Sequence, residues 1–384
     1  MRIGFNFHTS DDYISGVEYY SLGLLKSLCQ YQQGNIYIVF TNAPALVEKY
    51  TGRYENLIIR DLSRLKSRLH RIVWEHTALP VILSREKIDV LHCPHYICPI
   101  WSRNIPYVVT IHDTIAIDNP KMCKVSNALY YNMFLRSTVN KAAGIIAPSK
   151  NTSESICNGF KSVKQKIEII YPGIDTIFYC ELEQLAANAV KDKYHLPDKY
   201  ILYVGNIEPK KNLANLLKAY EILKKKGIEH QLVLAGKRNW KSEKLIDQIK
   251  SVHCNDVILT GYVARHDLPF VYSQADVFVF PSLVEGFGFG PLEAMRCGTA
   301  TAASDTGILQ ELSRGGFSML NPENTEQMSE AILNLITNEK LRHRQIDNAT
   351  VETEKFHWQK CARRTALFYK RVYDAHHNRK ASIC

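Results

Sequence analysis

The chain has 384 residues, which is more than one hydrophobic core usually supports, so we expect two domains. Hydrophobic residues make up 46% and charged residues 22% of it, as in a globular protein, and no apolar run approaches the roughly 20 residues that a membrane-spanning helix needs. The net charge of +10 permits nucleic acid, an anionic membrane or a phosphorylated substrate as a partner and selects none of them.

The cysteines and the first residues indicate the compartment. The 10 cysteines follow no C-x-x-C or other regular spacing, which in a chain of this size indicates free thiols in a reducing environment. Residues 1–7 resemble the start of a strand and not a signal peptide. We therefore expect a cytoplasmic protein.

The first half alternates short apolar runs with helical patterns. Its strand candidates are residues 2–7, 36–40, 57–60, 88–92, 107–111, 144–147 and 167–171. Such alternation predicts an α/β domain with a parallel, doubly wound sheet and helices on both faces.

A basic pattern lies between the third and fourth of these runs. Arg64, Arg68 and Arg71 recur at helical spacing, and the apolar residues at 65, 69, 72 and 73 would form a separate face of the same helix. One interpretation is an ordinary solvated helix face. The other is a surface for anionic lipid headgroups or for a lipid-linked diphosphate acceptor.

Two segments with histidine require interpretation. Residues 92–98 contain two histidines and two cysteines, but the spacing does not fit a zinc finger and Pro94 interrupts it, so we expect no metal there. The strand candidate 107–111 runs directly into His112 and Asp113. Ligands of open α/β sheets bind beyond the C-terminal ends of strands, so His112 is a candidate ligand contact; the alternative is a structural histidine.

The second half repeats the pattern after a junction. Turn residues bracket the stretch 172–198, and strand candidates follow at 200–204, 231–236, 257–263, 277–280 and 299–303. Lys210 and Lys211 come after the first of these, ahead of a helix whose N-cap would be Asn212. Two ammonium groups at a strand end could neutralise a diphosphate, although surface lysines without a role are the alternative.

The most informative stretch is 276–298. The strand candidate 277–280 precedes three glycines at alternating positions, Gly286, Gly288 and Gly290, and Pro291 fits the first position of a helix. Glycines let a backbone approach a ligand closely, and the N–H groups of a helix start attract phosphate.

Two carboxylates flank this turn. Glu285 precedes the glycines and Glu293 would lie in the first turn of the helix, so both can face one ligand. Carboxylates accept hydrogen bonds from the hydroxyls of a sugar or ribose. For either glutamate alone, a solvated or helix-stabilising role is the alternative.

The spacing Glu285-x7-Glu293 within EGFGFGPLEAMRCG resembles the signature of family 4 retaining glycosyltransferases, which have the two-domain GT-B fold. A dinucleotide-binding fingerprint is excluded because its third glycine would fall at Glu293. The resemblance extends to YPGID at 171–175, GNIEPKKN at 205–212 and FHW at 356–358. Lys210 stands where arginine is commoner in the family, which keeps the charge but loses the bidentate fork.

The resemblance implies two Rossmann-like, doubly wound domains facing across a cleft. They would be an acceptor-binding domain at 1–175 and a nucleotide-sugar-binding domain at 176–355, with a helix at 356–384 returning to the first. The implied catalytic residues are His112, Lys210, Lys211 and Glu285. The implied donor-binding residues are Gly16, Gly205, Lys210, Lys211, Tyr262, Val263, Glu285, Gly286, Phe287, Gly288, Phe289, Gly290 and Glu293.

The implied reaction is retaining transfer of a hexose from a nucleotide sugar to a glycan or lipid-linked acceptor, with no cofactor and no metal. The strings WEHTALP at 74–80 and IHD at 111–113 resemble mannosyltransferases of surface polysaccharide assembly, so the donor would be GDP-mannose, with UDP-glucose as a second choice. The alternatives are a glycogen- or sucrose-synthase-like transferase and a sugar-nucleotide epimerase of the same fold. A nucleic-acid-binding protein is a distant alternative without a matching motif, so we expect no nucleic acid partner. Peripheral attachment to the inner face of the cell membrane through the three arginines would agree with the basic charge.

Overall fold

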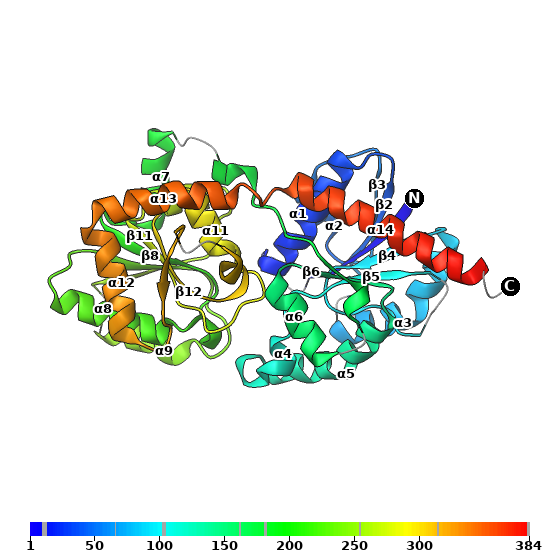
Figure 1. The fold of residues 1–384 in the computed structure, drawn as a ribbon, viewed down its shortest axis with the longest axis horizontal. Helices are drawn as coiled ribbons and strands as arrows, with labels where there is room; N and C mark the ends of the chain where they lie inside the picture. The colour runs from blue at the N-terminus through cyan, green and yellow to red at the C-terminus, as the bar shows by residue number, and fades with distance from the viewer. Residues whose placement is uncertain are drawn as a thin grey trace. The chain divides into compact units, whose positions relative to one another are not determined.

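The computed structural model describes residues 1–9, 14–65, 67–101, 105–160, 163–179, 183–252, 255–312 and 315–381. The chain divides into two compact units, Met1–Gly173 with Phe356–Cys384, and Ile174–Lys355. The sequence predicted domain boundaries between residues 175 and 176 and between residues 355 and 356. Each unit is a parallel sheet with helices packed on its faces (Figure 1).

The first unit contains a seven-stranded sheet in the order β3-β2-β1-β4-β5-β6-β7. Its strands are β1 (Arg2–Phe7), β2 (Ile36–Thr41), β3 (Leu57–Asp61), β4 (Val90–Cys93), β5 (Tyr107–Thr110), β6 (Gly144–Ala147) and β7 (Ile167–Ile169). Its helices are α1 (Gly16–Tyr31), α2 (Pro44–Thr51), α3 (Arg68–Arg85), α4 (Ile115–Asp118), η1 (Pro120–Met122), α5 (Val125–Lys141), α6 (Lys150–Gly159), η2 (Lys164–Lys166) and α14 (Trp358–Ala381). The central strands are buried on both faces, which explains their unbroken apolar runs.

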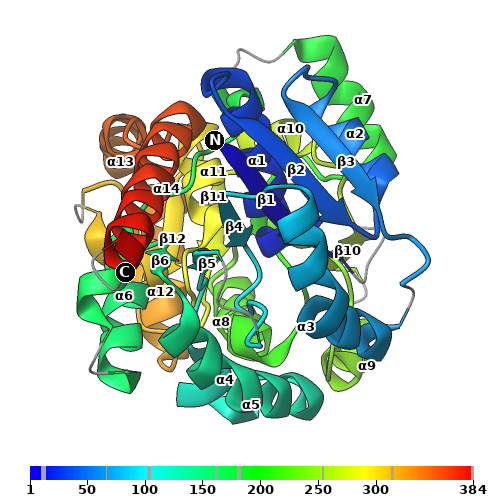
Figure 2. The same cartoon turned by 90° about the vertical axis from the view of Figure 1, so that its right-hand side faces the viewer.

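Helix α14 closes the first unit, although it comes from the end of the chain. It lies along α1 (Figure 2). Gly23 of α1 makes room for Trp358, since a Cβ atom there would lie 2.4 Å from the indole ring. The Tyr369 hydroxyl and Nδ1 of His92 are 2.6 Å apart. Contacts so far apart in sequence bind the two ends of the chain into one core.

The second unit contains a six-stranded sheet in the order β10-β9-β8-β11-β12-β13. Its strands are β8 (Tyr200–Val204), β9 (Gln231–Ala235), β10 (Val257–Gly261), β11 (Val277–Phe280), β12 (Thr301–Ser304) and β13 (Ser318–Leu320). Its helices are η3 (Thr176–Tyr179), α7 (Gln184–Tyr194), η4 (Pro209–Lys211), α8 (Leu213–Lys225), α9 (Glu243–Val252), α10 (Leu268–Ser273), α11 (Phe289–Arg296), η5 (Gly307–Glu311), α12 (Thr325–Thr337) and α13 (Glu339–Thr353). The edge strand β13 was not expected, because its sequence Ser-Met-Leu is neither an apolar run nor β-branched.

The two parallel α/β sheets confirm the expected fold class. In each sheet the strand order reverses beside the first strand, between β1 and β4 in the first unit and between β8 and β11 in the second. Loops diverge at such a point and leave room for a ligand at the carboxyl ends of the strands. No helix within the described residues is long and apolar enough to cross a membrane.

The arginine helix differs from its expected form. Ser67 caps α3 by accepting a hydrogen bond from the His70 amide, so the helix begins at Arg68 and excludes Arg64. The three arginines therefore do not share one helical stripe. The expected apolar face is also exposed in part, since Leu69 and Val73 are 69% and 52% exposed.

Candidate functional site

Loops at the carboxyl ends of β8, β11 and β12 meet in the second unit. The Leu283 amide after β11 donates to the Lys210 carbonyl after β8 at 2.9 Å. The Ile308 amide after β12 donates to the Phe287 carbonyl, also at 2.9 Å. These backbone bonds bring Lys210, Lys211 and residues 285–290 together at the reversal of strand order.

A buried ion pair forms the centre of this cluster. Lys211 Nζ lies 2.5 Å from Glu285 Oε1, and the two side chains are only 13% and 11% exposed. The ammonium group also lies 4.9 Å from the centre of the Phe280 ring. Burial alone would raise the pKa of Glu285, but the charges of Lys211 and Lys210 outweigh it and hold that pKa below its usual value. Glu285 is therefore an anion at neutral pH.

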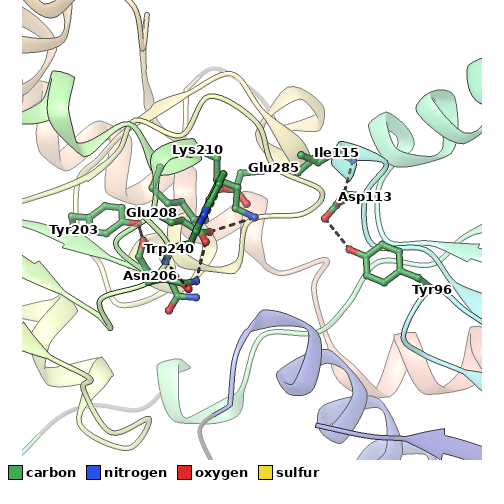
Figure 3. Close-up of polar contacts among 11 residues, drawn as sticks. Tyr96, Asp113, Ile115, Tyr203, Asn206, Glu208, Lys210, Trp240 and Glu285 are labelled. Atoms are coloured by element: carbon green, nitrogen blue, oxygen red, sulfur yellow. Dashed lines mark hydrogen bonds and ion pairs between the residues drawn. The ribbon is translucent and has the colours of Figure 1, made fainter. Parts of the chain in front are cut away.

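Lys210 belongs to a second ion pair beside the first. Its Nζ lies 3.4 Å from Oε1 of Glu208 (Figure 3). Asn239 Nδ2 donates to Oε2 of Glu208 at 3.0 Å. Asn239 follows β9, so this network joins a fourth strand-end loop to the site. Glu208 was not anticipated from the sequence, because nothing in its neighbourhood shows that Asn239 is its partner.

Helix α11 begins earlier than the sequence suggested. It starts at Phe289, two residues before Pro291, which occupies its third position. Gly288 precedes it with φ of +90°, a conformation that favours glycine and turns the loop into the helix. Glu293 is therefore in the second turn and not in the first. Proline at 291 is tolerated because the first four N–H groups of a helix have no partner within it.

Glu293 is held by two protein donors. Arg265 Nη2 donates to its Oε1 at 3.0 Å, and the Tyr272 hydroxyl donates to its Oε2 at 3.2 Å. The residue is 4% exposed. Each carboxylate oxygen can accept a further hydrogen bond, so contact with a ribose stays a prediction. Arg265 was missed, since its separation of 28 positions from Glu293 along the chain conceals the pairing.

The other expected donor-binding residues surround this cluster. Gly205 follows β8 with φ of +152°. A Cβ atom at Gly307 would lie 2.5 Å from the Phe287 carbonyl oxygen. Glycine at position 307 therefore allows the glycine-rich loop to approach the segment after β12 closely. Tyr262 is 39% exposed and Val263 is 5% exposed, so only the former presents its side chain to solvent. The Phe287 and Phe289 rings meet edge to face at 5.0 Å.

In the first unit, His112 lies two residues beyond β5. Its Nε2 atom is 2.7 Å from the Pro94 carbonyl oxygen. Because a carbonyl only accepts, Nε2 carries the proton and Nδ1 retains a lone pair. Burial lowers the pKa of His112 to about 4, although the Pro94 carbonyl and Asp113 act in the opposite direction. His112 is therefore neutral and can accept a hydrogen bond from a hydroxyl group.

Tyr96 packs against His112. Their ring centres are 5.4 Å apart, and the Tyr96 hydroxyl donates to Asp113 Oδ2 at 2.8 Å (Figure 3). Asp113 Oδ1 also accepts from the Ile115 amide at 3.1 Å. Tyr96 has φ of +62°, which is unusual for a bulky residue and marks a strained turn.

A polar pocket of about 370 Å³ lies in the same unit. His8, Glu75, Arg71, His95 and Tyr96 are among its lining residues. Gly16 is not, but its neighbours Ser15 and Val17 are, and Gly16 itself is exposed at the first position of α1.

Two nitrogen atoms of this pocket are buried without a hydrogen-bond partner. They are Nδ1 of His8 and Nε of Arg71. Nε2 of His8 lies 3.0 Å from the Asn6 side-chain oxygen, and Nε of Arg71 lies 3.9 Å from the Glu75 carboxylate. Burial and the Arg71 charge lower the pKa of His8 to about 3, although the Asn42 side chain acts in the opposite direction. The pocket thus offers a neutral acceptor and a cationic donor to a ligand.

The histidines of residues 92–98 have protein partners. His92 bonds Tyr369 and, through Nε2, the Thr110 hydroxyl at 2.8 Å, while Nε2 of His95 lies 3.1 Å from the Ser21 hydroxyl. Burial lowers the pKa of His92 to about 3. The described part of the chain contains no group of three or more metal-ligating side chains.

Two family models match the chain. Residues 14–178 match "Glycosyltransferase Family 4", and residues 188–352 match "Glycosyl transferases group 1". The chain is a glycosyltransferase of this family. The two matches together span most of both units.

Relatives of this glycosyltransferase differ in the sugar that their names state. O-antigen chain mannosyltransferase B of Escherichia coli is 27% identical over 289 residues, covering 73% of this chain and 74% of that protein. A Campylobacter jejuni enzyme, named as an N-acetylgalactosaminyltransferase acting on a diphospho-undecaprenol-linked sugar, is 30% identical over 238 residues. That match covers 60% of this chain and 61% of the relative.

The fold is shared with solved structures. Anabaena HepE in complex with UDP-glucose has a TM-score of 0.74 and 17% sequence identity to the glycosyltransferase, covering 98% of this chain and 99% of HepE. At that identity the likeness concerns the fold alone.

Proposed function

We propose that the enzyme transfers a hexose, with mannose from GDP-mannose as first choice and glucose from UDP-glucose as second, to a glycan or lipid-linked acceptor in surface polysaccharide assembly. The observation that carries this proposal is the buried Lys211–Glu285 pair beside Lys210, at the reversal of strand order in the second unit. Mannose is preferred because of the E. coli relative and the WEHTALP and IHD strings.

The second unit has the charges that departure of a nucleoside diphosphate requires. Negative charge grows on the leaving group as its bond to the sugar breaks, so groups that bind this charge accelerate the step. Lys211 gives one N–H to Glu285 and has two more for phosphate oxygens. The ion pair holds Lys211 in place beforehand, so little reorganisation is needed during the reaction.

The proposed reaction retains the configuration of the sugar. The bond between the anomeric carbon and the diphosphate oxygen breaks, and the acceptor hydroxyl oxygen forms the new bond on the same face. The hydroxyl proton passes to the departing diphosphate, whose oxygen becomes more basic as it leaves. Neither a metal ion nor an enzyme nucleophile takes part.

The acceptor is assigned to the polar pocket of the first unit. The lone pair of His8 Nδ1 accepts from a sugar hydroxyl, and Arg71 donates to a hydroxyl or phosphate oxygen of the same acceptor. His112, neutral at the end of β5, contacts a hydroxyl of the transferred sugar. A pocket of about 370 Å³ has room for one or two sugar rings.

A donor screen tests the proposal. The protein is incubated with GDP-mannose, UDP-glucose and UDP-N-acetylgalactosamine in separate reactions, and slow release of nucleoside diphosphate is measured with and without EDTA. We expect hydrolysis of one donor, GDP-mannose first, at an equal rate with EDTA. A requirement for manganese would contradict metal independence. Conversion of a UDP-sugar to its epimer, or no turnover of any donor, would contradict transfer itself.

A further inference from the structure

We propose that the outer side of α3 and α5 in the first unit docks on an anionic lipid bilayer. Six large apolar side chains of this region are more than half exposed to solvent. They are Leu69 and Val73 of α3, Trp101, and Val125, Leu129 and Met133 of α5, and are called the α3–α5 apolar face below.

The two helices are in direct contact. Arg68 donates to the Asn127 side-chain oxygen at 3.0 Å, and its guanidinium lies 4.3 Å from the centre of the Tyr130 ring. One or two turns further on, the rings of His76 and Phe134 stack at 5.5 Å. The helices lie in the same part of the unit in both views (Figures 1 and 2).

The exposed side chains of both helices turn to the same side. The contacts pair in the same order along the chain, so the helices run in a similar direction. Leu69 follows contact residue Arg68, whereas Leu129 precedes contact residue Tyr130, and each step rotates a side chain by about 100°. The two helices face each other and run in a similar direction. A step forward on α3 and a step backward on α5 therefore turn Leu69 and Leu129 to the same side of the helix pair. Trp101 extends the face, since its ring lies 5.2 Å from that of His76.

A bilayer on this face would leave the polar pocket uncovered. Arg71 and Glu75 of α3 line the pocket, and each stands two residues after an apolar-face residue, Leu69 or Val73. Two residues correspond to about 200° around a helix, so the pocket and the apolar face lie on opposite sides of α3.

Charge decides which partner fits. Residues 62–74 contain four basic residues, residues 119–141 contain four more, and neither segment has an aspartate or glutamate. Lys121 and Lys124 are exposed ahead of α5. Apolar side chains including tryptophan, surrounded by basic residues, are the composition of an interfacial membrane surface. Self-association through this face would bring exposed basic residues of the two copies together, among them Lys121, Lys124 and Arg136, which disfavours a dimer.

This proposal does not depend on the donor or the acceptor, so it is tested without substrate. Wild-type protein is sedimented with vesicles of phosphatidylcholine alone and with vesicles containing about one third phosphatidylglycerol, at 0.1 M salt. We expect binding to the anionic vesicles only. Equal binding to both, or to neither, would overturn the proposal.

Paired variants then locate the surface. Lys121→Gln with Lys124→Gln should weaken vesicle binding about 30-fold, because each basic residue near an anionic surface contributes about 1 kcal/mol. Leu129→Gln with Met133→Gln should weaken it about 10-fold or more, because these side chains no longer leave water favourably.

Matched control pairs lie elsewhere. Val351 and Leu367 are 69% and 55% exposed, and Lys225 and Lys226 are exposed at the end of α8. Their replacement by Gln should leave vesicle binding unchanged. Equal losses in control and test pairs would overturn the assignment to α3 and α5. So would sedimentation velocity showing that wild type is a dimer and that the Leu129/Met133 variant is a monomer, since the face would then bind a second copy.

Discussion

The strand-end sites of the two units differ in how their polar groups are paired. In the second unit Lys211 is bonded to Glu285 and Glu293 to Arg265, before any ligand arrives. In the first unit the pocket keeps His8 Nδ1 and Arg71 Nε buried without a hydrogen-bond partner, although Arg71 Nε lies 3.9 Å from the Glu75 carboxylate. The second unit also has buried hydroxyl groups without a hydrogen-bond partner, those of Ser304 and Thr306, so the difference between the two sites concerns their charged and titratable groups. Ion pairs that are already formed hold the charged side chains of the second unit in position for the diphosphate of a donor. In the first unit, a ligand would supply the hydrogen bonds that the buried nitrogen atoms of the pocket lack. The comparison therefore favours the donor in the second unit and the acceptor in the first.

The largest expected difference between the units is their response to acid. Burial holds the pKa of His8 and His92 at about 3 and that of His112 at about 4, and all three belong to the first unit. Burial also lowers the pKa of His76 and His95 in this unit, which acts in the same direction. Below the unfolded pKa of about 6.5 the unfolded chain binds protons that the folded unit does not, so stability falls as the pH drops from 6.5 toward 4. At pH 5.5 each histidine costs about 1.4 kcal/mol, or about 4 kcal/mol for the three.

Hydrogen exchange followed by mass spectrometry at pH 7.5 and 5.5, corrected for intrinsic rates, measures this loss for each unit separately. We expect protection to fall first in peptides from the first unit. His92→Gln should reduce the pH dependence by about a quarter or less, since His8, His76, His95 and His112 keep their contributions. Equal loss of protection in both units would remove this distinction between them.

Loss of the central carboxylate should reduce the rate strongly. Glu285→Gln removes the partner that positions Lys211, beside the proposed transferred sugar, and we expect kcat to fall about 100-fold or more. Exposed Glu323 supplies the control, because Glu323→Gln should leave kcat unchanged. Steady-state kinetics with circular dichroism to verify folding provide the measurement. A change in KM with kcat near the wild-type value would show that Glu285 does not act on the reacting sugar.

If the pocket of the first unit binds the acceptor, a change in its polar groups should alter the KM for the acceptor. Arg71→Gln removes a cationic donor, so acceptor KM should rise about 10-fold while donor hydrolysis stays constant. Arg85, exposed at the other end of α3, provides the matched variant Arg85→Gln with no expected effect. If Arg71→Gln slows donor hydrolysis as much as transfer, the acceptor assignment of the pocket fails.

The smallest expected effect is at Glu293. It is assigned to the ribose, which does not change during reaction, so Glu293→Gln should raise donor KM about fivefold and leave kcat nearly unchanged. Arg265→Lys should act in the same direction, because Arg265 holds Glu293 through a guanidinium contact that lysine cannot reproduce. A fall in kcat at constant KM for Glu293→Gln would place this residue at the reacting centre.

The sequence by itself determined the features that depend on neighbouring residues. The strand at 277–280, the glycine turn after it and the lysine pair after β8 all belong to single local patterns. The α/β class followed from the alternation of such patterns, because the period of apolar residues reports local structure directly. His112 became a candidate ligand contact in the same way, from its place after a buried strand, and that role stays a prediction.

Only the tertiary structure decided which side chains meet. Arg265 pairs with Glu293, Glu208 with Asn239, and Glu75 approaches His8, each across a separation along the chain that no local pattern reports. The start of α11 at Phe289 and the exposure of Leu69 and Val73 were also decided there. The physical reason is that helix ends and burial depend on what packs against an element, and these neighbours come from other parts of the chain.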